Sequence, residues 1–186
     1  MQLPAFRQFN LVGGTALALQ IGHRISIDLD FFTYQEYDGT KVTTELQRLG
    51  NLEVLVDKPP FLQVRLDEVK IDFLKFPYPF VQDFIEVEGV RLVPIENIVV
   101  MKLLAIARRG VKKDFFDLYF ILERYSMDEV VRLFLAKMPH VDMFHIFKSL
   151  TYFGDADPDA NPKMLMKVTW PVVKKTIMRK VHAYVK

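Results

Sequence analysis

The chain has 186 residues, of which 51% are hydrophobic and 26% are charged. A chain of this length and apolar content can bury a core, which excludes a disordered protein and favours one domain, or one domain with a helical extension. The absence of cysteine excludes a disulfide framework and thiolate-bound zinc. There is no targeting pattern, and apolar windows such as residues 95–107 contain charges well inside the roughly 18 apolar residues that a membrane span needs. We therefore expect a cytoplasmic protein without a membrane segment.

The formal net charge of +2 hides an asymmetry along the chain. Residues 163–186 contain seven Lys or Arg and no Asp or Glu, whereas acids outnumber bases in the residues before them. The C-terminal segment is therefore a separate basic region, and its partners are expected to be anionic.

The first half of the chain mixes strand and helix patterns. In chain order the sequence predicts a strand at 9–12, the pair Gly13-Gly14, a helix at 15–23, a buried strand at 27–33, a helix at 38–50, strands at 53–57, 61–67 and 69–76, and a hairpin at 84–93 that turns at Glu88-Gly89. After Pro94 the apolar residues take helical spacing. The sequence there predicts helices at 95–109, 112–125, 128–138 and 141–153, a loop at 154–162 and a final helix at 171–186. This order indicates an α+β fold, with an α+β part at residues 1–93 and a helical part at residues 94–186.

The final helix would be amphipathic. Its basic stripe would contain Lys175, Arg179, His182 and Lys186, and its apolar stripe Val173, Ile177, Val181 and Tyr184. We expect the apolar stripe to pack on the rest of the protein. The basic stripe would then suit an RNA backbone or an acidic partner, and a merely solvated helix is an equal alternative.

Three aspartates lie inside apolar strand patterns, which is an unusual setting for a carboxylate. Asp28 and Asp30 are two residues apart, so in a strand they project from the same face. Two carboxylates about 4 Å apart repel by roughly 4 kcal/mol at an effective dielectric constant near 20, so they need a cation or solvent. Asp72 would join them if its strand lies alongside. Such acids can hold Mg²⁺ or Mn²⁺ and support phosphoryl or nucleotidyl transfer.

The glycine pair that precedes the first helix fits the same chemistry. Gly13 and Gly14 let the backbone approach a ligand closely, and the N–H groups at the start of the following helix favour phosphate oxygens. Thr15 could add a hydroxyl donor. A D-x-D pair or a Gly-Gly pair alone is more often structural, so the prediction depends on their order along the chain.

Three motifs together resemble one protein family. They are residues 12–32, VGGTALALQIGHRISIDLDFF, residues 70–74, KIDFL, and residues 102–122, KLLAIARRGVKKDFFDLYFIL. The combination is similar to the AbiEii/AbiGii toxin family of nucleotidyltransferases, which belongs to the DNA polymerase β-like superfamily. The resemblance implies a mixed sheet flanked by helices, followed by a helical region. It also implies an NTP co-substrate, Mg²⁺ or Mn²⁺, and the toxin role in a type IV toxin–antitoxin or abortive-infection system, with a possible cognate antitoxin.

The resemblance also implies roles for individual residues. It assigns Gly13 and Gly14 to phosphate binding, Asp28 and Asp30 to the metal, and Asp72 to the third acid. Arg24 and Ser26 would contact phosphate or brace the site, Lys102 would meet nucleotide phosphate, and Asp117 matches a late aspartate of the family. From the residues alone, Lys102 could instead lie along an apolar helix, and Asp114 and Asp117 could be ordinary acids at a helix start.

We therefore expect a nucleotidyltransferase that moves an NMP from an NTP to an RNA or protein hydroxyl, with the tRNA 3′ end favoured. A nucleotide sensor without catalysis and a metal-dependent phosphatase or nuclease are the alternatives.

Overall fold

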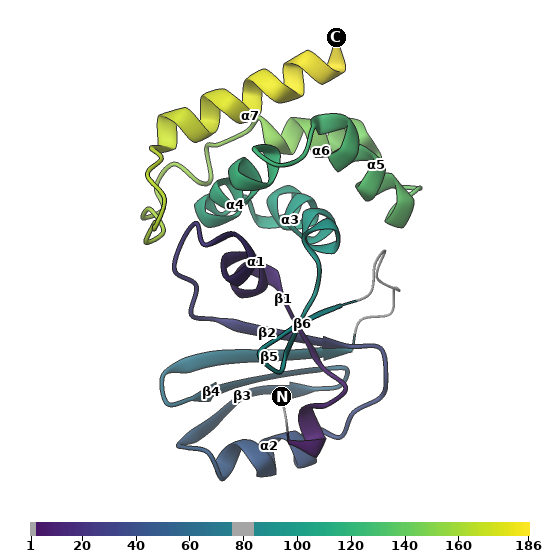
Figure 1. Ribbon diagram of the computed structural model, residues 1–186, viewed down its shortest axis with the longest axis vertical. Coiled ribbons are helices and arrows are strands. Elements are labelled where there is room, and N and C mark those ends of the chain that lie inside the picture. The colour runs from purple at the N-terminus through teal and green to yellow at the C-terminus, as the bar shows by residue number, and fades with distance from the viewer. Residues whose placement is uncertain (1–2, 76–83) are drawn as a thin grey trace. The chain divides into compact units, whose positions relative to one another are not determined.

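The computed structural model describes residues 3–75 and 84–186. The chain forms two compact units (Figure 1). The first unit contains residues 1–16 and 26–94, and the second contains residues 17–25 and 95–186. The sequence placed a boundary at 93/94, one residue from the break at Pro94, but the segment Leu17–Ile25 belongs to the helical unit.

A mixed sheet dominates the first unit, and within the described residues its strand order is β3-β4-β5-β2-β1-β7-β6. The strands are β1 (Asn10–Val12), β2 (Leu29–Thr33), β3 (Leu52–Lys58), β4 (Phe61–Leu66), β5 (Val69–Lys75), β6 (Ile85–Val87) and β7 (Val90–Leu92). Strand β2 lies at the centre, antiparallel to β1 and parallel to β5. The α+β class predicted from the sequence is confirmed.

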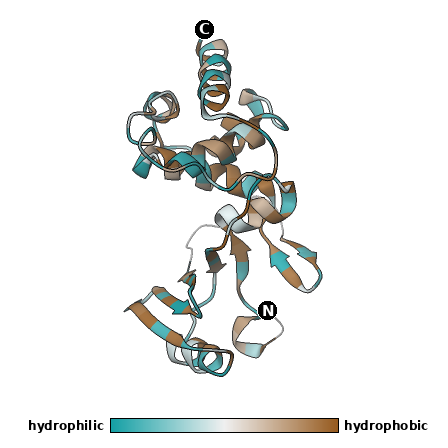
Figure 2. Cartoon of the chain, turned by 90° about the vertical axis from the view of Figure 1, so that its left-hand side faces the viewer, coloured by the Kyte–Doolittle hydropathy of each residue, from teal (hydrophilic) through white to brown (hydrophobic). Residues whose placement is uncertain are grey.

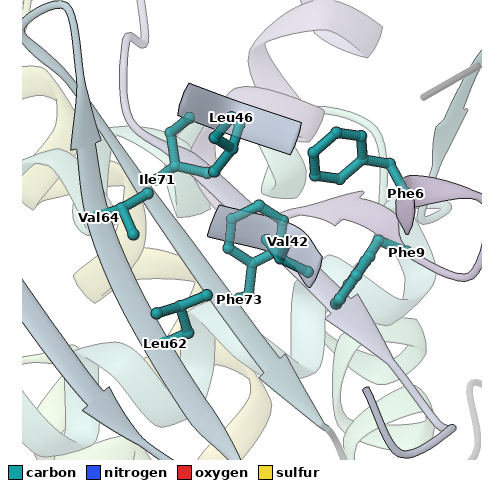
Figure 3. Packing of buried hydrophobic residues seen from close by; sticks show 8 residues of the cluster. All are labelled: Phe6, Phe9, Val42, Leu46, Leu62, Val64, Ile71 and Phe73. Carbon is teal, nitrogen blue, oxygen red and sulfur yellow. The ribbon is translucent and has the colours of Figure 1, made fainter. Parts of the chain in front are cut away.

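One face of this sheet is apolar. Side chains from β4 and β5 alternate between buried and partly exposed, and the residues of the strands alternate in hydropathy in Figure 2. Helix α2 (Gly39–Gln47) lies along the sheet in Figure 1, and the short helix η1 (Pro4–Phe6) packs against α2. Figure 3 shows the resulting core, which contains Phe6, Phe9, Val42, Leu46, Leu62, Val64, Ile71 and Phe73. The Phe73 ring lies 5.0 Å from that of Phe9 and 5.4 Å from that of Phe31.

The second unit is helical. Its helices are α3 (Ile95–Arg109), α4 (Lys112–Leu122), α5 (Met127–Lys137), α6 (Met143–Leu150) and α7 (Trp170–Val185). Helix α3 packs on α4, α5 and α6, and α7 packs on α4, α5 and α6. The chain enters this unit within α1 (Gly13–Ile21), whose second half belongs to it. No helix within the described ranges has the length and hydropathy to cross a membrane.

Several predicted boundaries shift for physical reasons. Helix α1 begins at Gly13 rather than at residue 15, so the glycine pair is its first turn. The helix predicted at 112–125 ends at Leu122 because Ser126 takes an extended conformation and caps α5 with a full capping box. Asp142 caps α6, which begins at Met143. The strand predicted at 69–76 ends at Lys75, and Phe76 lies outside the described residues.

The strand at 27–33 was predicted to be buried, and this was wrong for most of its length. Strand β2 begins at Leu29, and its first four residues are only half-buried. Both faces of β2 share this exposure, because Leu29 and Phe31 pack against the core and are still half-buried, as is Asp30 on the opposite face.

Candidate functional site

Two of the three predicted acids are neighbours in the sheet. Strands β2 and β5 pair in parallel with Asp30 opposite Asp72. Their chain neighbours Ile71 and Phe73 are buried in the core, and Leu29 packs against it. Because side chains alternate along a strand, and opposite residues in a parallel pair share a face, both carboxylates project from the face away from the core. Adjacent strands are about 4.8 Å apart, so the two acids stand side by side.

Gly13 lies directly against the carboxylate of Asp30. Residue Val12 is opposite Asp30 in the β1–β2 pair, which brings the start of α1 to the same place. A Cβ atom at Gly13 would lie 2.5 Å from Asp30 Oδ2, and the Gly13 φ is +68°. Both the backbone conformation and the close approach therefore require glycine at this position. The predicted neighbourhood of the glycine pair and an acid is present in the first unit.

The hydroxyl groups beside the acids brace the backbone. Thr15 Oγ1 lies 2.9 Å from Ser26 Oγ and is also hydrogen-bonded to the carbonyl oxygen of Asp28. Thr15 is buried, whereas Gly13 and Gly14 are only half-buried. These contacts hold the start of α1 to the residues that precede β2. A phosphate contact of Thr15 or Ser26 stays a prediction.

Asp72 has two neutralising neighbours on the same face. Gln63 Nε2 donates to Asp72 Oδ1 at 2.9 Å, and Lys70 Nζ lies 3.5 Å from Asp72 Oδ2. The Asp72 side chain is 20% exposed, so it is reachable from solvent. The Gln63 amide and the Lys70 ammonium group stabilise the negative charge of Asp72, as a carboxylate inside an apolar strand needs.

The acids of the first unit do not form a complete metal site among the described residues. Among residues 3–75 and 84–186, no three His, Asp or Glu side chains form a group that could hold a metal ion by themselves. Asp28 immediately precedes β2, and Asp30 and Asp72 are paired across the strands. Mg²⁺ is usually held by one or two carboxylates together with substrate phosphates and waters. The residues present fit that mode rather than a complete cage of protein ligands.

The second unit gathers the remaining predicted residues in a buried ion cluster. Lys102 Nζ lies 2.8 Å from Asp114 Oδ1 and 2.6 Å from Asp117 Oδ2. Arg24 Nε and Nη2 donate to the two oxygens of Asp117 at 2.6 and 2.9 Å. Both aspartates are fully buried. Lys102 and Arg24 therefore direct their charges to carboxylates here, and the phosphate contacts implied for them stay predictions.

Electrostatics in this cluster favour the charged forms. Burial by itself would lower the pKa of Lys102, but Asp117 and Asp114 outweigh burial and raise it. Burial would raise the pKa of Asp117, but Lys102, Arg24 and a hydrogen bond from His23 hold it well below its usual range. The 2.7 Å contact of His23 Nε2 with Asp117 Oδ1 completes the set. His23 Nδ1 is buried without a hydrogen-bond partner among the described residues.

The cluster also fixes the segment that leads to the acids of the first unit. Residues Arg24 and Met164 form a β-bridge, and Leu165 N donates to His23 O at 2.8 Å. Arg24 lies two residues before Ser26. The segment 22–25 is thus held by its side chains and by its backbone within the second unit.

Sequence reasoning missed Gln63, His23 and the pairing of Asp114. The sequence signal for Asp114 was its place between Lys113 and Phe115 in an apolar helix, since acids in such helices are rarely buried unless paired. The signal for His23 was its position at the end of an apolar helix, next to Arg24. Gln63 gives no signal, because only the β4–β5 register brings it opposite Asp72.

The predicted stripes of the last helix are confirmed with one exception. Val173, Ile177 and Val181 are buried, but Tyr184 is 37% exposed and touches the structure through Phe147, at 5.5 Å between ring centres. All members of the basic stripe are exposed: Lys175, Arg179, His182 and Lys186. Figure 2 shows hydrophilic and hydrophobic residues alternating along this helix.

The chain is similar in sequence and in fold to known proteins. The uncharacterized protein aq_aa25 of Aquifex aeolicus is 34% identical over 182 residues, which are 95% of this chain and 87% of that protein. Among solved structures, the fold is similar to MenT4, the nucleotidyltransferase toxin Rv2826c of Mycobacterium tuberculosis, with a TM-score of 0.63, 18% identity, and coverage of 94% of this chain and 74% of that one. It is also similar to JHP933 of Helicobacter pylori, with a TM-score of 0.54, 18% identity, and coverage of 97% and 88%.

The family assignment rests on a match along nearly the whole chain. The family model described as "Nucleotidyl transferase AbiEii toxin, Type IV TA system" matches residues 2–183. That range contains all three motifs from which the resemblance was predicted, and it extends through most of α7. The chain belongs to the AbiEii family of nucleotidyltransferase toxins of type IV toxin–antitoxin systems.

Proposed function

We propose that the chain transfers an NMP from an NTP to a hydroxyl of an RNA, with the tRNA 3′ end as the favoured acceptor. The observation that carries this proposal is the pairing of Asp30 with Asp72 on the face of the sheet away from its core, with Gly13 against Asp30. Family membership supports the reaction class. The exposed basic stripe of α7 supports an anionic acceptor, because phosphates are neutralised by Lys and Arg.

Each group of the first unit has a part in the proposed reaction. The N–H groups at the start of α1, beside Gly13 and Gly14, bind the phosphates of the NTP. Asp28 and Asp30 would hold Mg²⁺ or Mn²⁺, which when bound neutralises charge on the phosphate oxygens. Asp72 accepts the proton of the acceptor hydroxyl, or assists a second ion. The acceptor oxygen attacks the α-phosphorus, the bond to the β-phosphate oxygen breaks, and pyrophosphate leaves.

The buried cluster of the second unit has a supporting part in the proposal. Lys102 and Asp117 hold Arg24, and Arg24 holds the start of the segment that continues to Ser26 and Asp28. We propose that these residues act on catalysis through this segment. We also propose that the protein has a cognate antitoxin and that it acts in the cytoplasm.

The test is incubation of the protein with labelled NTPs, Mg²⁺ and total tRNA. The expected result is label in RNA, with pyrophosphate as the second product, and loss of label in Asp30→Asn. Equal labelling by Asp30→Asn would reject the assigned site. Release of inorganic phosphate or shortened RNA instead of pyrophosphate would select a phosphatase or nuclease. Tight NTP binding without product for any acceptor would select the sensor.

A further inference from the structure

The second unit contains an open basic pocket that the proposed reaction does not use. The pocket has a volume of about 210 Å³ and lies between the end of α3, the helix α6 and the turn that follows α6. Its ionisable and aromatic lining residues are Arg108, Arg109, His145, Lys148, Tyr152 and Asp155.

The lining of this pocket has an excess of cationic groups. Arg108, His145 and Lys148 are exposed, and no carboxylate in the described part of the chain pairs with them. Asp155 is the single acid of the lining. Three Lys and Arg side chains against one carboxylate leave a net positive charge, to which His145 adds a hydrogen-bond donor.

One of these cations is held in place by the buried cluster. Arg109 Nε donates to Asp114 Oδ2 at 3.0 Å, while the Arg109 side chain remains 55% exposed. Asp114 also pairs with the buried Lys102, so Arg109 shares its carboxylate with a second cation. Arg109 is the exposed one of the two, so the part of its guanidinium that faces solvent is available at the pocket. A cation fixed before a ligand arrives loses less conformational entropy on binding.

The rival explanation is that the cations only stabilise helix ends. Arg108 and Arg109 lie in the last turn of α3 and Lys148 in the last turn of α6, where a positive charge interacts well with the helix dipole. That explanation does not cover His145, which lies one turn earlier on the same face of α6 as Lys148 and Ser149. It also does not cover Tyr152, which is 59% exposed at the pocket.

We propose that this pocket binds one nucleotide of a single-stranded RNA segment, with the phosphate on Arg108, Arg109 and Lys148 and the base against Tyr152. The volume is smaller than the roughly 300–1,000 Å³ of pockets that enclose a drug-sized ligand, which suits one unit of a longer strand. Cationic groups beside an exposed aromatic ring are the usual means of binding a single strand without reading its sequence. This inference rests on the RNA acceptor of the proposed function, and it names a binding site remote in sequence from the acids of the first unit.

The test measures binding of a short fluorescent single-stranded RNA to the full chain by anisotropy, without NTP and over a series of salt concentrations. Arg108→Glu and Lys148→Glu are each expected to weaken binding about tenfold, the equivalent of one charge-assisted hydrogen bond. The slope of log affinity against log salt should fall by roughly 0.7 for each phosphate that the variant no longer neutralises on a single strand. Tyr152→Ala should weaken binding by roughly tenfold, because the base has no ring to stack on, and leave the slope unchanged.

The matched control is Arg132→Glu, which reverses an exposed charge on α5 outside the pocket. It should leave the affinity and the slope as in the wild type, and Lys148→Arg should keep both near the wild-type values. Wild-type affinity and slope in Arg108→Glu and Lys148→Glu would overturn the pocket, whether or not these variants are less stable.

The same preparations are assayed for transfer of labelled NMP, which separates the two proposals. Pocket-dependent RNA binding without any transfer by the wild type would overturn the proposed reaction and leave the pocket standing. Transfer to RNA that is lost in Asp30→Asn, with binding that ignores the pocket variants, would overturn the pocket alone. A wild type that modifies a protein hydroxyl and does not bind the RNA would overturn the pocket and the RNA acceptor together.

Discussion

The two units of the chain both place carboxylates inside apolar segments, but they treat them differently. In the first unit Asp30 and Asp72 project from the face of the sheet away from the core and are half-buried. In the second unit Asp114 and Asp117 are fully buried and contacted by three cations. Asp72 has partners too, Lys70 and Gln63, but its side chain stays partly exposed, whereas the second pair is closed off from solvent. An acid in an apolar segment is therefore not by itself a sign of a reactive site, because burial with paired cations can account for it.

Removal of one accessible carboxylate should have the largest effect on activity. In Asp30→Asn the rate of NMP transfer should fall about a thousandfold or more, because a catalytic metal supplies several kcal/mol of transition-state stabilisation. The thermal midpoint should stay near that of the wild type, since one half-buried side chain is replaced by an isosteric one. A rate assay with labelled NTP and a melting curve by circular dichroism check the two halves of this prediction. A folded variant with wild-type rate would contradict it.

Removal of one buried carboxylate should act on stability first. Asp117→Asn leaves Lys102 and Arg24 without their shared acceptor charge, and breaking one side of a buried pair typically costs about 3–5 kcal/mol. Urea unfolding measures this loss in the free energy of unfolding. The control is Asp157→Asn, an exposed acid of the same unit that pairs with Lys174, and its midpoint should barely change. Equal stability of the two variants would show that the buried cluster is not a structural support.

Alanine substitutions at two glycines with the same backbone conformation distinguish the effect of backbone strain from an effect on the candidate site. Gly13 and Gly22 have φ values of +68° and +74°, so alanine should cost about 1–2 kcal/mol of stability at either position. Only at Gly13 would the added Cβ displace the carboxylate of Asp30, since no atom lies within 4 Å of a Cβ at Gly22. We expect the activity of folded Gly13→Ala to fall well below that of folded Gly22→Ala. Equal activities, measured well below both thermal midpoints, would remove Gly13 from the site.

The contribution of the buried cluster to the free energy of unfolding should decrease at acidic pH. The pKa of Asp117 is lower in the folded chain than its ordinary value of 3.8, so the unfolded chain binds the extra proton in the window between the two values. Stability from Asp117 is therefore present above that ordinary value and is lost as the pH falls through the folded pKa. Urea midpoints of the wild type should fall more steeply than those of Asp117→Asn below a pH of about 4. Parallel pH profiles would contradict the lowered pKa.

Local sequence signals predicted much of the fold because they act over short distances. The hairpin turn at Glu88-Gly89 is present, with φ values of 51° and 75°, which these positions of a tight turn require. The capping box at Ser126 and Glu129 is also present. The helix predicted to reach residue 125 ends at Leu122, because Ser126 forms the capping box of the next helix. Competition between adjacent elements is not visible in the periodicity of one of them.

The arrangement of the candidate site depends on contacts that local patterns do not encode. Asp30 and Asp72 meet only because β5 pairs with β2, a strand much earlier in the chain, rather than because of their own spacing. Arg24 meets Asp117 across a separation of 93 residues. Only the resemblance of the three motifs to a known family predicted that these residues contribute to one site. That Asp114 and Asp117 are compensated follows only from the packing of α3 on α4, which brings Lys102 to both.

Binding of Mn²⁺ tests the division between the two acid clusters most directly, because Mn²⁺ suits carboxylate sites and is detected by electron paramagnetic resonance. The wild-type chain is titrated with Mn²⁺ in the presence of a non-hydrolysable NTP analogue, beside Asp30→Asn and Asp117→Asn at a temperature at which all three are folded. Our account predicts that Asp30→Asn loses the bound ion and that Asp117→Asn retains it. Retention by Asp30→Asn, with loss by Asp117→Asn, would contradict the account.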